Sequence, residues 1–493
     1  MVGVISILVR TLFVKYLPLE FLGYEGLFGN IFAVLSLADL GINTLITYRL
    51  YPAFAERNEE EISRLMAIYK YIFRIIGFVV LLLGFLLIPS LRFLIKDNSL
   101  DWKYIYIVYI MQLSTVLCTY FLAYKRVLFE VDQVGYKCVQ IEMACSFIGN
   151  LVRAAVIFLF KNYILYLLVN ILSNIITNCI IAFRADKEYA YTNKKIQITK
   201  DELKNSGFGK DIKNNIAQKI AGIIYGSTDN ILISAFLGIK IVGKVGNYSI
   251  ITGYVSTILE KILEPFQASI GNLVYSSDLK KGTDLFRMFE LLGFLLADFV
   301  VVSYLNLLNP LVKLWLGAEF ILGESYVIAF ALNAYIKWNH QFLAYYRYSF
   351  GKYELDKNYI LAGAVLNIII SIWLAQYWGL AGIMTGTAVG HIGFWVGRVR
   401  VVYSEYLDEK VCNYILRQIR NIIILLTNVV IMWLVCHNIT SGWNGFVLKM
   451  LMCFAVPNLI NFIIFYGTNE MRMIIEYVHV LIDILKTVLS QNK

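Results

Sequence analysis

The chain has 493 residues, of which 59% are hydrophobic and only 16% are charged, and its mean hydropathy is +0.66. A soluble domain is about 25% charged and about 45–50% apolar, so this composition excludes an ordinary soluble protein. The net charge is +10, which in a membrane protein reflects Lys and Arg gathered in the loops on one side of the bilayer. We therefore expect no nucleic-acid partner.

Apolar runs recur along the whole chain, and each is long enough to cross a hydrocarbon core about 30 Å thick as a helix. The run at residues 75–88, "IIGFVVLLLGFLLI", does not alternate as a barrel strand would. We predict an all-α polytopic membrane protein of about 14 transmembrane helices. The predicted spans lie near residues 2–17, 26–50, 70–95, 103–124, 139–160, 163–184, 214–238, 245–275, 288–316, 322–347, 358–377, 380–402, 418–436 and 446–466.

Charged residues interrupt the first two predicted spans. Arg10 lies about halfway along the first span, which has no cleavage-type A-x-A sequence after it, so we expect it to be retained. Asp39 lies in "SLADLGINTLITYRLY" at residues 36–51, where a central carboxylate would cost on the order of 3 kcal/mol. We predict that Asp39 faces the protein interior and pairs with Arg10; the alternative is a cap at the membrane interface.

The longest polar stretch follows the sixth predicted span and reads "RADKEYAYTNKKIQITKDELKNSGFGKDIKNN" at residues 184–215. We predict a basic cytoplasmic linker at 186–213 between an N-terminal lobe, 1–185, and a C-terminal lobe, 214–403. Residues 404–493 would then add two helices and a cytoplasmic tail. The sequence G-x-x-G-N opens the second span at Gly26 and the eighth at Gly243, as expected of a six-span repeat.

Several segments carry a family resemblance. They are "GYEGLFGNIFAVLSLADLGINTLITYRLYPAFAE" at residues 23–56, "IAGIIYGSTDNILISAFLG" at 220–238, "ASIGNLV" at 268–274 and "LNPLVKLWLG" at 308–317. These segments resemble bacterial oligosaccharide-lipid flippases, which export O-antigen, capsule or exopolysaccharide repeat units. Those flippases form the polysaccharide-exporter branch of the multidrug/oligosaccharidyl-lipid/polysaccharide (MOP) superfamily, which also holds the multidrug and toxin extrusion (MATE) transporters.

The resemblance implies a MATE-like fold, with two pseudo-symmetric six-helix lobes around a central cavity plus two C-terminal helices. It implies alternating access and the flipping of a polyprenyl-pyrophosphate-linked oligosaccharide to the outer leaflet, for cell-surface polysaccharide biosynthesis. Such a protein is a transporter and not an enzyme. It would lie among the lipids of the bacterial plasma membrane, with a polysaccharide polymerase and chain-length machinery as partners.

A pyrophosphate headgroup must have its charge compensated as it crosses the bilayer, so cations should line the cavity. The candidates among the basic residues of the predicted spans are Arg10, Arg153, Lys219, Lys261 and Lys337. Arg grips phosphate through a planar fork, whereas Lys acts as a point charge. The alternative for those near a helix end is that they extend to the lipid headgroups.

Acidic residues within spans are candidates for coupling transport to H⁺ or Na⁺, and they are Asp39, Asp229, Glu260 and Glu264. Asp229 lies in "GSTDN", which could instead form an interhelical hydrogen-bond network. Glu260 and Glu264 are one turn apart and precede Pro265. Both cannot cheaply ionise unless Lys261 or another cation intervenes. The segment is also where the sequence departs from the family, whose members are mostly uncharged there.

The four histidines have no metal-binding spacing, so we expect neither a metal nor an organic cofactor. A MATE-type multidrug or cation antiporter is the alternative function, but it predicts a cavity richer in acids. A membrane-embedded polysaccharide polymerase would need a sizeable outer loop, and no predicted outer loop exceeds about a dozen residues. The predicted inner loops hold roughly thirty of the 44 Lys and Arg, so both termini should be cytoplasmic.

Overall fold

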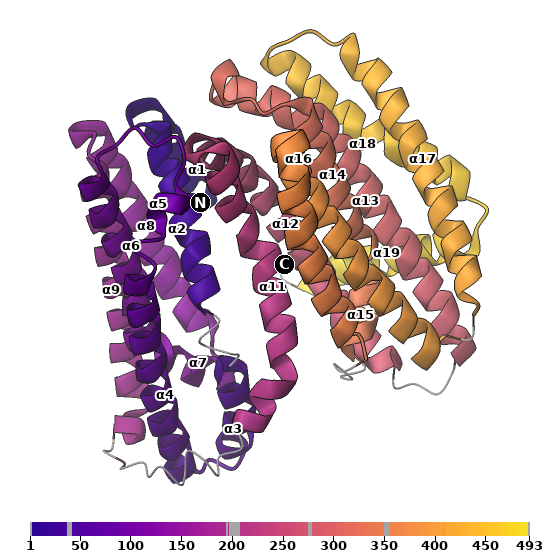
Figure 1. Ribbon diagram of the computed structural model, residues 1–493. Helices are drawn as coiled ribbons and strands as arrows, with labels where there is room; N and C mark the ends of the chain where they lie inside the picture. The colour runs from indigo at the N-terminus through magenta and orange to yellow at the C-terminus, as the bar shows by residue number, and fades with distance from the viewer. Residues whose placement is uncertain are drawn as a thin grey trace. The chain divides into compact units, whose positions relative to one another are not determined.

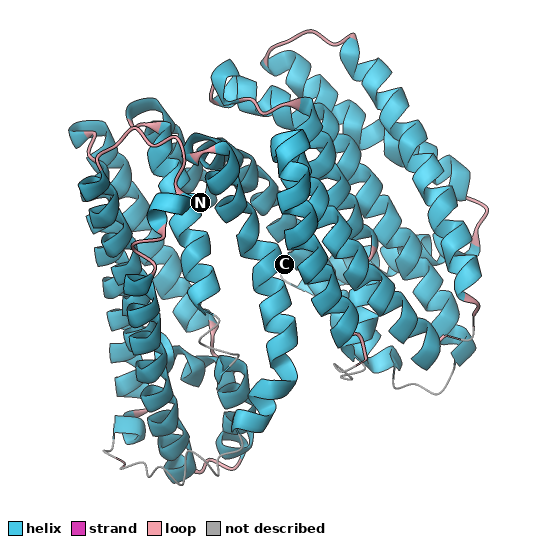
Figure 2. Cartoon of the chain, viewed as in Figure 1, coloured by secondary structure: helices cyan, strands magenta, loops and turns pink. Residues whose placement is uncertain are grey.

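The computed structural model describes residues 2–36, 42–193, 196, 208–274, 279–349, 355–407 and 409–491. Side chains are described over the same ranges except at residues 2, 44, 208–219, 268, 272–274, 279–281, 480–482 and 484–491. Within these ranges every regular element is a helix (Figure 2). The predicted all-α membrane fold is confirmed.

Packing divides the chain into two units, Met1–Gly246 and Asn247–Lys493. Unit 1 contains α1 (Val2–Tyr16), α2 (Leu19–Leu35), α3 (Ile42–Ala55), α4 (Glu59–Leu86), α5 (Leu91–Leu94), α6 (Trp102–Leu122), α7 (Arg126–Val131), α8 (Tyr136–Phe160), α9 (Tyr163–Glu188) and α11 (Phe208–Leu237). Unit 2 contains α13 (Leu279–Trp315), α14 (Glu324–Asn339), α15 (Gln341–Ser349), α16 (Lys357–Glu405), α17 (Val411–His437), α18 (Trp443–Phe465) and α19 (Asn469–Gln491). The helix α12 (Ile239–Val274) begins in unit 1 and continues into unit 2 (Figure 1).

The predicted spans fall on these helices. Nine helices of the described chain are long and apolar enough by themselves to cross a membrane, and α16 among them contains two predicted spans. Its backbone leaves helical geometry at Gly379 (φ 54°, ψ −125°), between the predicted spans 358–377 and 380–402. Four predicted spans fall on helices that are shorter or more charged, namely α1, α2 with α3, α12, and α14 with α15.

Two boundaries differ from the prediction. The single span expected at 26–50 begins earlier, at Leu19, and its first helix ends at Leu35 before α3 starts at Ile42. The span expected at 322–347 is divided at His340, which separates α14 from α15. The division of the sequence into lobes at 1–185, 214–403 and 404–493 stays a prediction, because the packing boundary at Gly246 follows contacts and not the repeat.

Polar side chains fix several helix ends. The Asn58 side chain accepts a hydrogen bond from the Glu61 amide at 3.0 Å and begins α4. Between α8 and α9, Lys161 adopts a left-handed conformation (φ 49°) that ends α8. The next residue, Asn162, accepts from the Ile164 amide at 2.9 Å and begins α9. Helix ends leave backbone N–H groups unsatisfied, and these side chains supply the acceptors.

Large apolar side chains point outward from the long helices. Phe183 is 74% exposed, Trp433 is 61% exposed and Leu459 is 60% exposed. A soluble protein rarely exposes so much contiguous apolar surface, whereas a membrane protein presents such residues to lipid. The chain is therefore a multi-pass membrane protein.

In unit 1, α1 packs against α8, α8 against α9, and α2 against α11. The start of α12 approaches α2 closely. A Cβ at Gly23 would lie 2.2 Å from the Ile239 carbonyl oxygen, and one at Gly243 would lie 2.7 Å from the Leu19 carbonyl oxygen. The two G-x-x-G-N segments noted in the sequence thus belong to two helices in direct contact.

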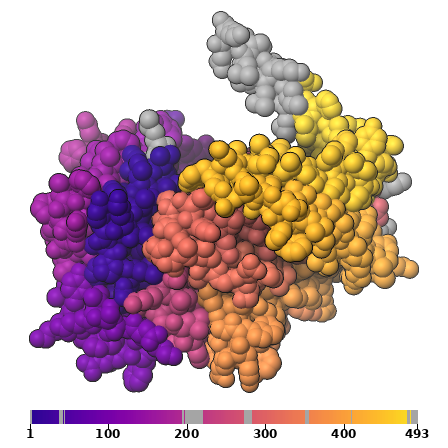
Figure 3. All heavy atoms as spheres, turned by 90° about the horizontal axis from the view of Figure 1, so that it is seen from above, coloured from indigo at the N-terminus to yellow at the C-terminus, as the bar shows by residue number. Residues whose placement is uncertain are grey.

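In unit 2, α13 is the central helix and packs against α14, α17 and α18, while α14 packs against α16. The two C-terminal membrane helices, α17 and α18, appear gold and yellow on one flank of this unit in the space-filling view (Figure 3). The carboxylate of Asp298 on α13 is fully buried and accepts hydrogen bonds from Asn428 of α17 at 2.8 Å and Asn461 of α18 at 2.7 Å. These bonds attach the two helices to the rest of unit 2.

Candidate functional site

Two of the predicted cavity cations, Arg10 and Arg153, meet in one polar cluster inside unit 1. Arg10 lies on α1 and Arg153 on α8, and these two helices pack together. Glu25 of α2 interacts electrostatically with both guanidinium groups and forms a hydrogen bond with Tyr166 of α9. Four helices therefore contribute to the cluster.

Amide side chains orient Arg153. Its guanidinium donates to the side-chain oxygen of Asn150 at 2.7 Å and to that of Asn170 at 3.1 Å. Asn150 in turn donates to Ser6 of α1 at 3.3 Å. Neutral acceptors hold the guanidinium in place without cancelling its charge, so it remains available to an anion.

An aromatic group packs beside the two arginines. The Arg153 guanidinium lies 5.8 Å from the centre of the Tyr166 ring. The Phe13 ring contacts the edges of Tyr163 and Tyr166 at centroid distances of 5.7 and 5.3 Å. Tyr163 stacks on Phe21 at 4.3 Å, and its hydroxyl accepts from Gln112 at 3.1 Å. The cluster is therefore held by packed rings from α1, α2 and α9, which favours a pre-formed geometry.

A glycine provides room for Arg10. A Cβ at Gly246 would lie 2.9 Å from the terminal guanidinium nitrogen of Arg10. The G-x-x-G-N segment of α12 therefore has a second role besides helix packing, because its second glycine accommodates this side chain. With two guanidinium groups and one carboxylate, the cluster carries one net positive charge. Such a site can bind an anion that forms bidentate hydrogen bonds.

Unit 2 contains a second group of cations around Lys337 of α14. Lys337 donates to Glu260 of α12 at 2.8 Å, and its ammonium lies 4.7 Å from the Trp338 ring centre. His391 of α16 interacts electrostatically with Lys337 and with Arg398. Arg398 donates to the Tyr348 hydroxyl at 3.1 Å, and its Nε is buried without a hydrogen-bond partner among the described residues.

The expected carboxylate pair of α12 is compensated. Glu260 is paired with Lys337, and Glu264 accepts from Lys261 at 2.7 Å. Each carboxylate has a lysine partner, which is the case that the sequence left open for Lys261 or another cation. Lys261 and Glu264 are 73% and 64% exposed, so this pair does not belong to a buried site within unit 2.

The other predicted site residues are placed as follows. Asp39 lies outside the described residues, so the expected contact between Asp39 and Arg10 stays a prediction. Lys219 belongs to α11, and its side chain is not among those described. Asp229 is partly buried on α11.

Sequence reasoning missed Glu25 and Arg398. Glu25 precedes the predicted start of the second span by one residue and so falls outside the predicted spans, because α2 begins earlier than expected. An isolated acid between Tyr24 and Gly26 in an apolar segment is the signal that could have identified it. Arg398 lies near the end of a predicted span, where extension to the headgroups is the ordinary interpretation.

The fold matches two kinds of solved membrane protein. One is the lipid II flippase MurJ in an inward closed conformation, with a TM-score of 0.68 and 14% identity, covering 94% of this chain and 97% of that one. The other is an inward-facing multidrug resistance MATE family transporter of the MOP superfamily, with a TM-score of 0.53 and 13% identity. That match covers 81% of this chain and 94% of the transporter.

No family model and no curated protein sequence matches the chain. At 14 and 13% identity the structural likeness establishes a shared fold. It confirms the MATE-like all-α fold expected from the resemblance noted in the sequence.

Proposed function

We propose that the chain is a transporter that moves a lipid-linked anion across the bilayer by alternating access, as a member of the MOP superfamily. The substrate we propose is a polyprenyl-pyrophosphate-linked oligosaccharide, flipped from the cytoplasmic to the outer leaflet of a bacterial plasma membrane. Its fold is that of a solved lipid II flippase. Electrostatic compensation of a diphosphate during transfer requires no covalent step, so we propose no enzymatic activity.

One observation carries this proposal. Arg10 and Arg153 lie in adjacent helices and share one polar cluster with a single carboxylate, Glu25. A diphosphate ester carries about two negative charges or more. Two guanidinium forks can bind its oxygens in a defined orientation, while the isoprenoid chain stays in lipid. Holding two arginines within a membrane is costly, and charged residues at such positions commonly mark a substrate pathway.

The cations of unit 2 support the same interpretation. His391 lies within electrostatic range of both Lys337 and Arg398, and Glu260 is the carboxylate paired with Lys337. We propose that this second group binds the pyrophosphate of the same substrate during part of its transfer across the bilayer. Coupling to H⁺ or Na⁺ through Asp39, Asp229, Glu260 or Glu264 stays a prediction, as does association with a polymerase and chain-length machinery.

A multidrug or cation antiporter is the alternative function, since a MATE transporter shares the fold. The net positive charge of the cluster around Arg10 and Arg153 argues against an organic cation there, because it would repel such a substrate. We therefore favour the anionic lipid.

The test is transport of a short-chain isoprenyl diphosphate disaccharide by the purified full-length chain in proteoliposomes. We expect Arg10→Gln and Arg153→Gln each to lower transport about tenfold or more, because each removes charge-assisted hydrogen bonds to the substrate. Arg153→Lys should be intermediate, since it keeps the charge and loses the fork.

Arg184→Gln is the matched control, because Arg184 pairs with Glu188 at the end of α9 and lies outside the cluster. Parent-like transport by a stably folded double variant of Arg10 and Arg153 would contradict the proposal.

A further inference from the structure

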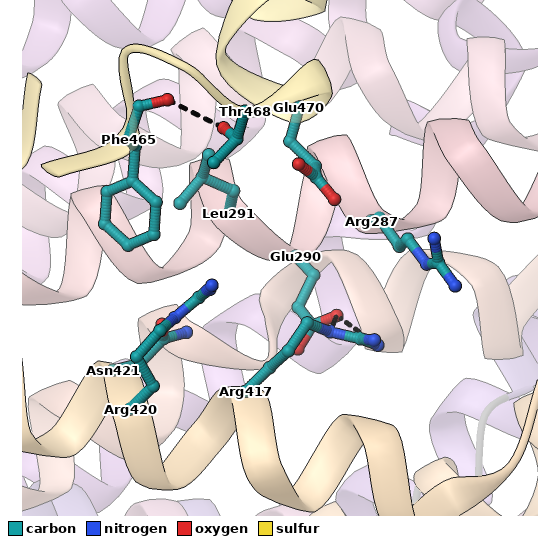
Figure 4. Close-up of a pocket in the computed structure, with 9 residues that line it drawn as sticks. All are labelled: Arg287, Glu290, Leu291, Arg417, Arg420, Asn421, Phe465, Thr468 and Glu470. Atoms are coloured by element: carbon teal, nitrogen blue, oxygen red, sulfur yellow. Dashed lines mark hydrogen bonds and ion pairs between the residues drawn. The ribbon is translucent and has the colours of Figure 1, made fainter.

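A small pocket opens to solvent in unit 2 where α13, α17 and the turn between α18 and α19 meet (Figure 4). The atom-free space there is about 270 Å³, part of which is open solvent. The side chains around it are both charged and apolar. Its lining comprises Arg287, Glu290, Leu291, Arg417, Arg420, Asn421, Phe465, Thr468 and Glu470.

From the length of α18 we expect the pocket to lie at the level of the lipid headgroups. Helix α18 has 23 residues and ends at Phe465, so it spans about 35 Å, slightly more than a hydrocarbon core of about 30 Å. Its last residue therefore reaches the membrane interface. Arg420 lies at the same level, because its guanidinium is 4.8 Å from the centre of the Phe465 ring.

Most charges near the pocket neutralise one another. Glu409 accepts from Arg287 at 2.9 Å and from Arg417 at 2.7 Å. Glu290 accepts from Arg417 at 2.9 Å and from Gln418 at 2.8 Å. Two arginines and two glutamates thus form a closed network in which every carboxylate has donors.

Two charged residues of the pocket, Arg420 and Glu470, do not belong to this network. Arg420 donates to the Asn421 side chain at 3.2 Å, and Glu470 lies in the first turn of α19. They interact electrostatically across the pocket, yet within the described part of the chain neither forms an ion pair within 4 Å. Arg420 extends from α17 and Glu470 from α19, on opposite walls (Figure 4).

We propose that this pocket binds the phosphoethanolamine headgroup of a membrane lipid. The phosphodiester binds Arg420, whose guanidinium is fixed against Phe465, and the primary ammonium binds Glu470. The separated cation and anion of the pocket match the separated anion and cation of this headgroup. Leu291 and Phe465 form the apolar part of the pocket wall.

The pocket also distinguishes this headgroup from its relatives. A phosphoglycerol headgroup lacks the ammonium and brings a net negative charge toward Glu470. A phosphocholine headgroup keeps its positive charge but has no N–H to donate to the carboxylate. The site lies in unit 2 and does not depend on the diphosphate substrate proposed for unit 1.

The test is lipid binding to the full-length chain in detergent, measured by native mass spectrometry with phosphatidylethanolamine, phosphatidylcholine and phosphatidylglycerol of identical acyl chains. We expect the parent protein to bind the ethanolamine lipid about tenfold more tightly than either competitor, as expected for one charge-assisted hydrogen-bonded pair. Glu470→Gln should abolish the preference and raise phosphatidylglycerol binding. Arg420→Gln should weaken binding of all three lipids.

Two exposed residues of α19 outside the pocket provide controls, since Glu476→Gln and Arg472→Gln should leave the preference unchanged. Should Arg420→Gln fail to fold, the parent protein still tests the proposal with ethanolamine lipids that carry one, two or three N-methyl groups. Binding should fall when the third methyl group is added, because that group removes the last N–H donor. Equal binding of ethanolamine and choline lipids by the parent would overturn the proposal. The proposal would also be overturned if soluble glycerophosphoethanolamine competed as well as the lipid, because the site would then not require a membrane lipid.

Discussion

Arg153 donates a hydrogen bond to the side-chain oxygen of Asn150, three residues earlier on α8, at 2.7 Å. Asn150 is buried and its amide nitrogen reaches Ser6 on α1. It therefore fixes the guanidinium of Arg153 and also connects the helices that carry the two arginines.

The first prediction concerns this orientation. Asn150→Ala should lower the affinity for a short isoprenyl diphosphate about fivefold, because Arg153 loses its shorter orienting acceptor. Asn150→Asp should lower it further, since the new carboxylate would compete for the guanidinium. Isothermal titration with farnesyl diphosphate measures both. The control is Asn458→Ala on the exposed side of α18, where the side chain bonds only to its own helix.

The second prediction concerns the close approach of α2 and α12. Gly23→Ala would place a Cβ 2.2 Å from the Ile239 carbonyl oxygen, so backbone must move and the melting temperature should fall. Gly29 lies on the same helix, and a Cβ there meets nothing within 4 Å. Gly29→Ala should be neutral or stabilising by up to about 1 kcal/mol, because Ala favours helix. Equal melting temperatures for the two variants would show that the contact is not tight.

The predictable part of the fold follows from hydropathy, because apolar runs of about twenty residues identify helices without knowledge of their partners. The helix boundaries were harder to predict from hydropathy. The division at His340 depends on packing, since the side chain of His340 is buried in unit 2. The break between the predicted spans 358–377 and 380–402 falls at Gly379, and glycine readily adopts the positive φ found there.

The site was predictable only in part. Arg10 and Arg153 were identified by charge within apolar segments, and the structure brings them together. Their acceptors Asn150 and Asn170 are ordinary polar residues in sequence. The lysine that pairs with Glu260 lies 77 residues away, and nothing local indicates that contact. A charged residue within a span is visible in the sequence of that one segment. The partner that compensates its charge lies on another helix and is known only from the fold.

The third prediction concerns pH and the loop between α16 and α17. Burial alone would raise the pKa of Glu409, but hydrogen bonds from Arg417 and Arg287 outweigh it and hold the pKa below the ordinary value of 4.5. A lowered folded-state pKa contributes stability that is present above the unfolded-state pKa and is lost as pH falls through the folded-state value. The melting temperature should therefore fall as the pH drops below about 4.5.

Replacing Glu409 by Gln should remove that part of the decline and lower stability at neutral pH, where the two arginines lose their acceptor. Exposed Glu476 supplies the control, and Glu476→Gln should leave the profile unchanged. Parallel pH profiles for the parent and the Glu409 variant would show that this carboxylate does not contribute.

The fourth prediction concerns orientation. Lys161 and Lys187 are exposed and lie at opposite ends of α9. The loop charges predict that the end of α9 at Lys187 lies in the cytoplasm. In a background without the seven native cysteines, the single substitutions Lys161→Cys and Lys187→Cys should differ in how readily an impermeant maleimide labels them in intact cells. The Lys161→Cys variant should be labelled and the Lys187→Cys variant should not. The reverse pattern would show that the predicted orientation is wrong.

The last prediction concerns Glu25, the carboxylate that shares the cluster with Arg10 and Arg153. Before substrate binds, Glu25 compensates part of the charge of the two arginines, which lowers the cost of holding them in the membrane. When a diphosphate binds, the same carboxylate repels it and competes with it for the guanidinium groups. Glu25→Gln keeps the size and the hydrogen bond to Tyr166 but removes the charge. Its affinity for farnesyl diphosphate should therefore rise about tenfold. Transport should not rise in proportion, since a substrate held more tightly is released more slowly. Glu142→Gln is the control on α8, because Glu142 pairs with Arg126 and lies outside the cluster. Unchanged or weaker affinity in Glu25→Gln would contradict the competition, whereas absence of any diphosphate binding by the parent would instead contradict the function proposed for the two arginines.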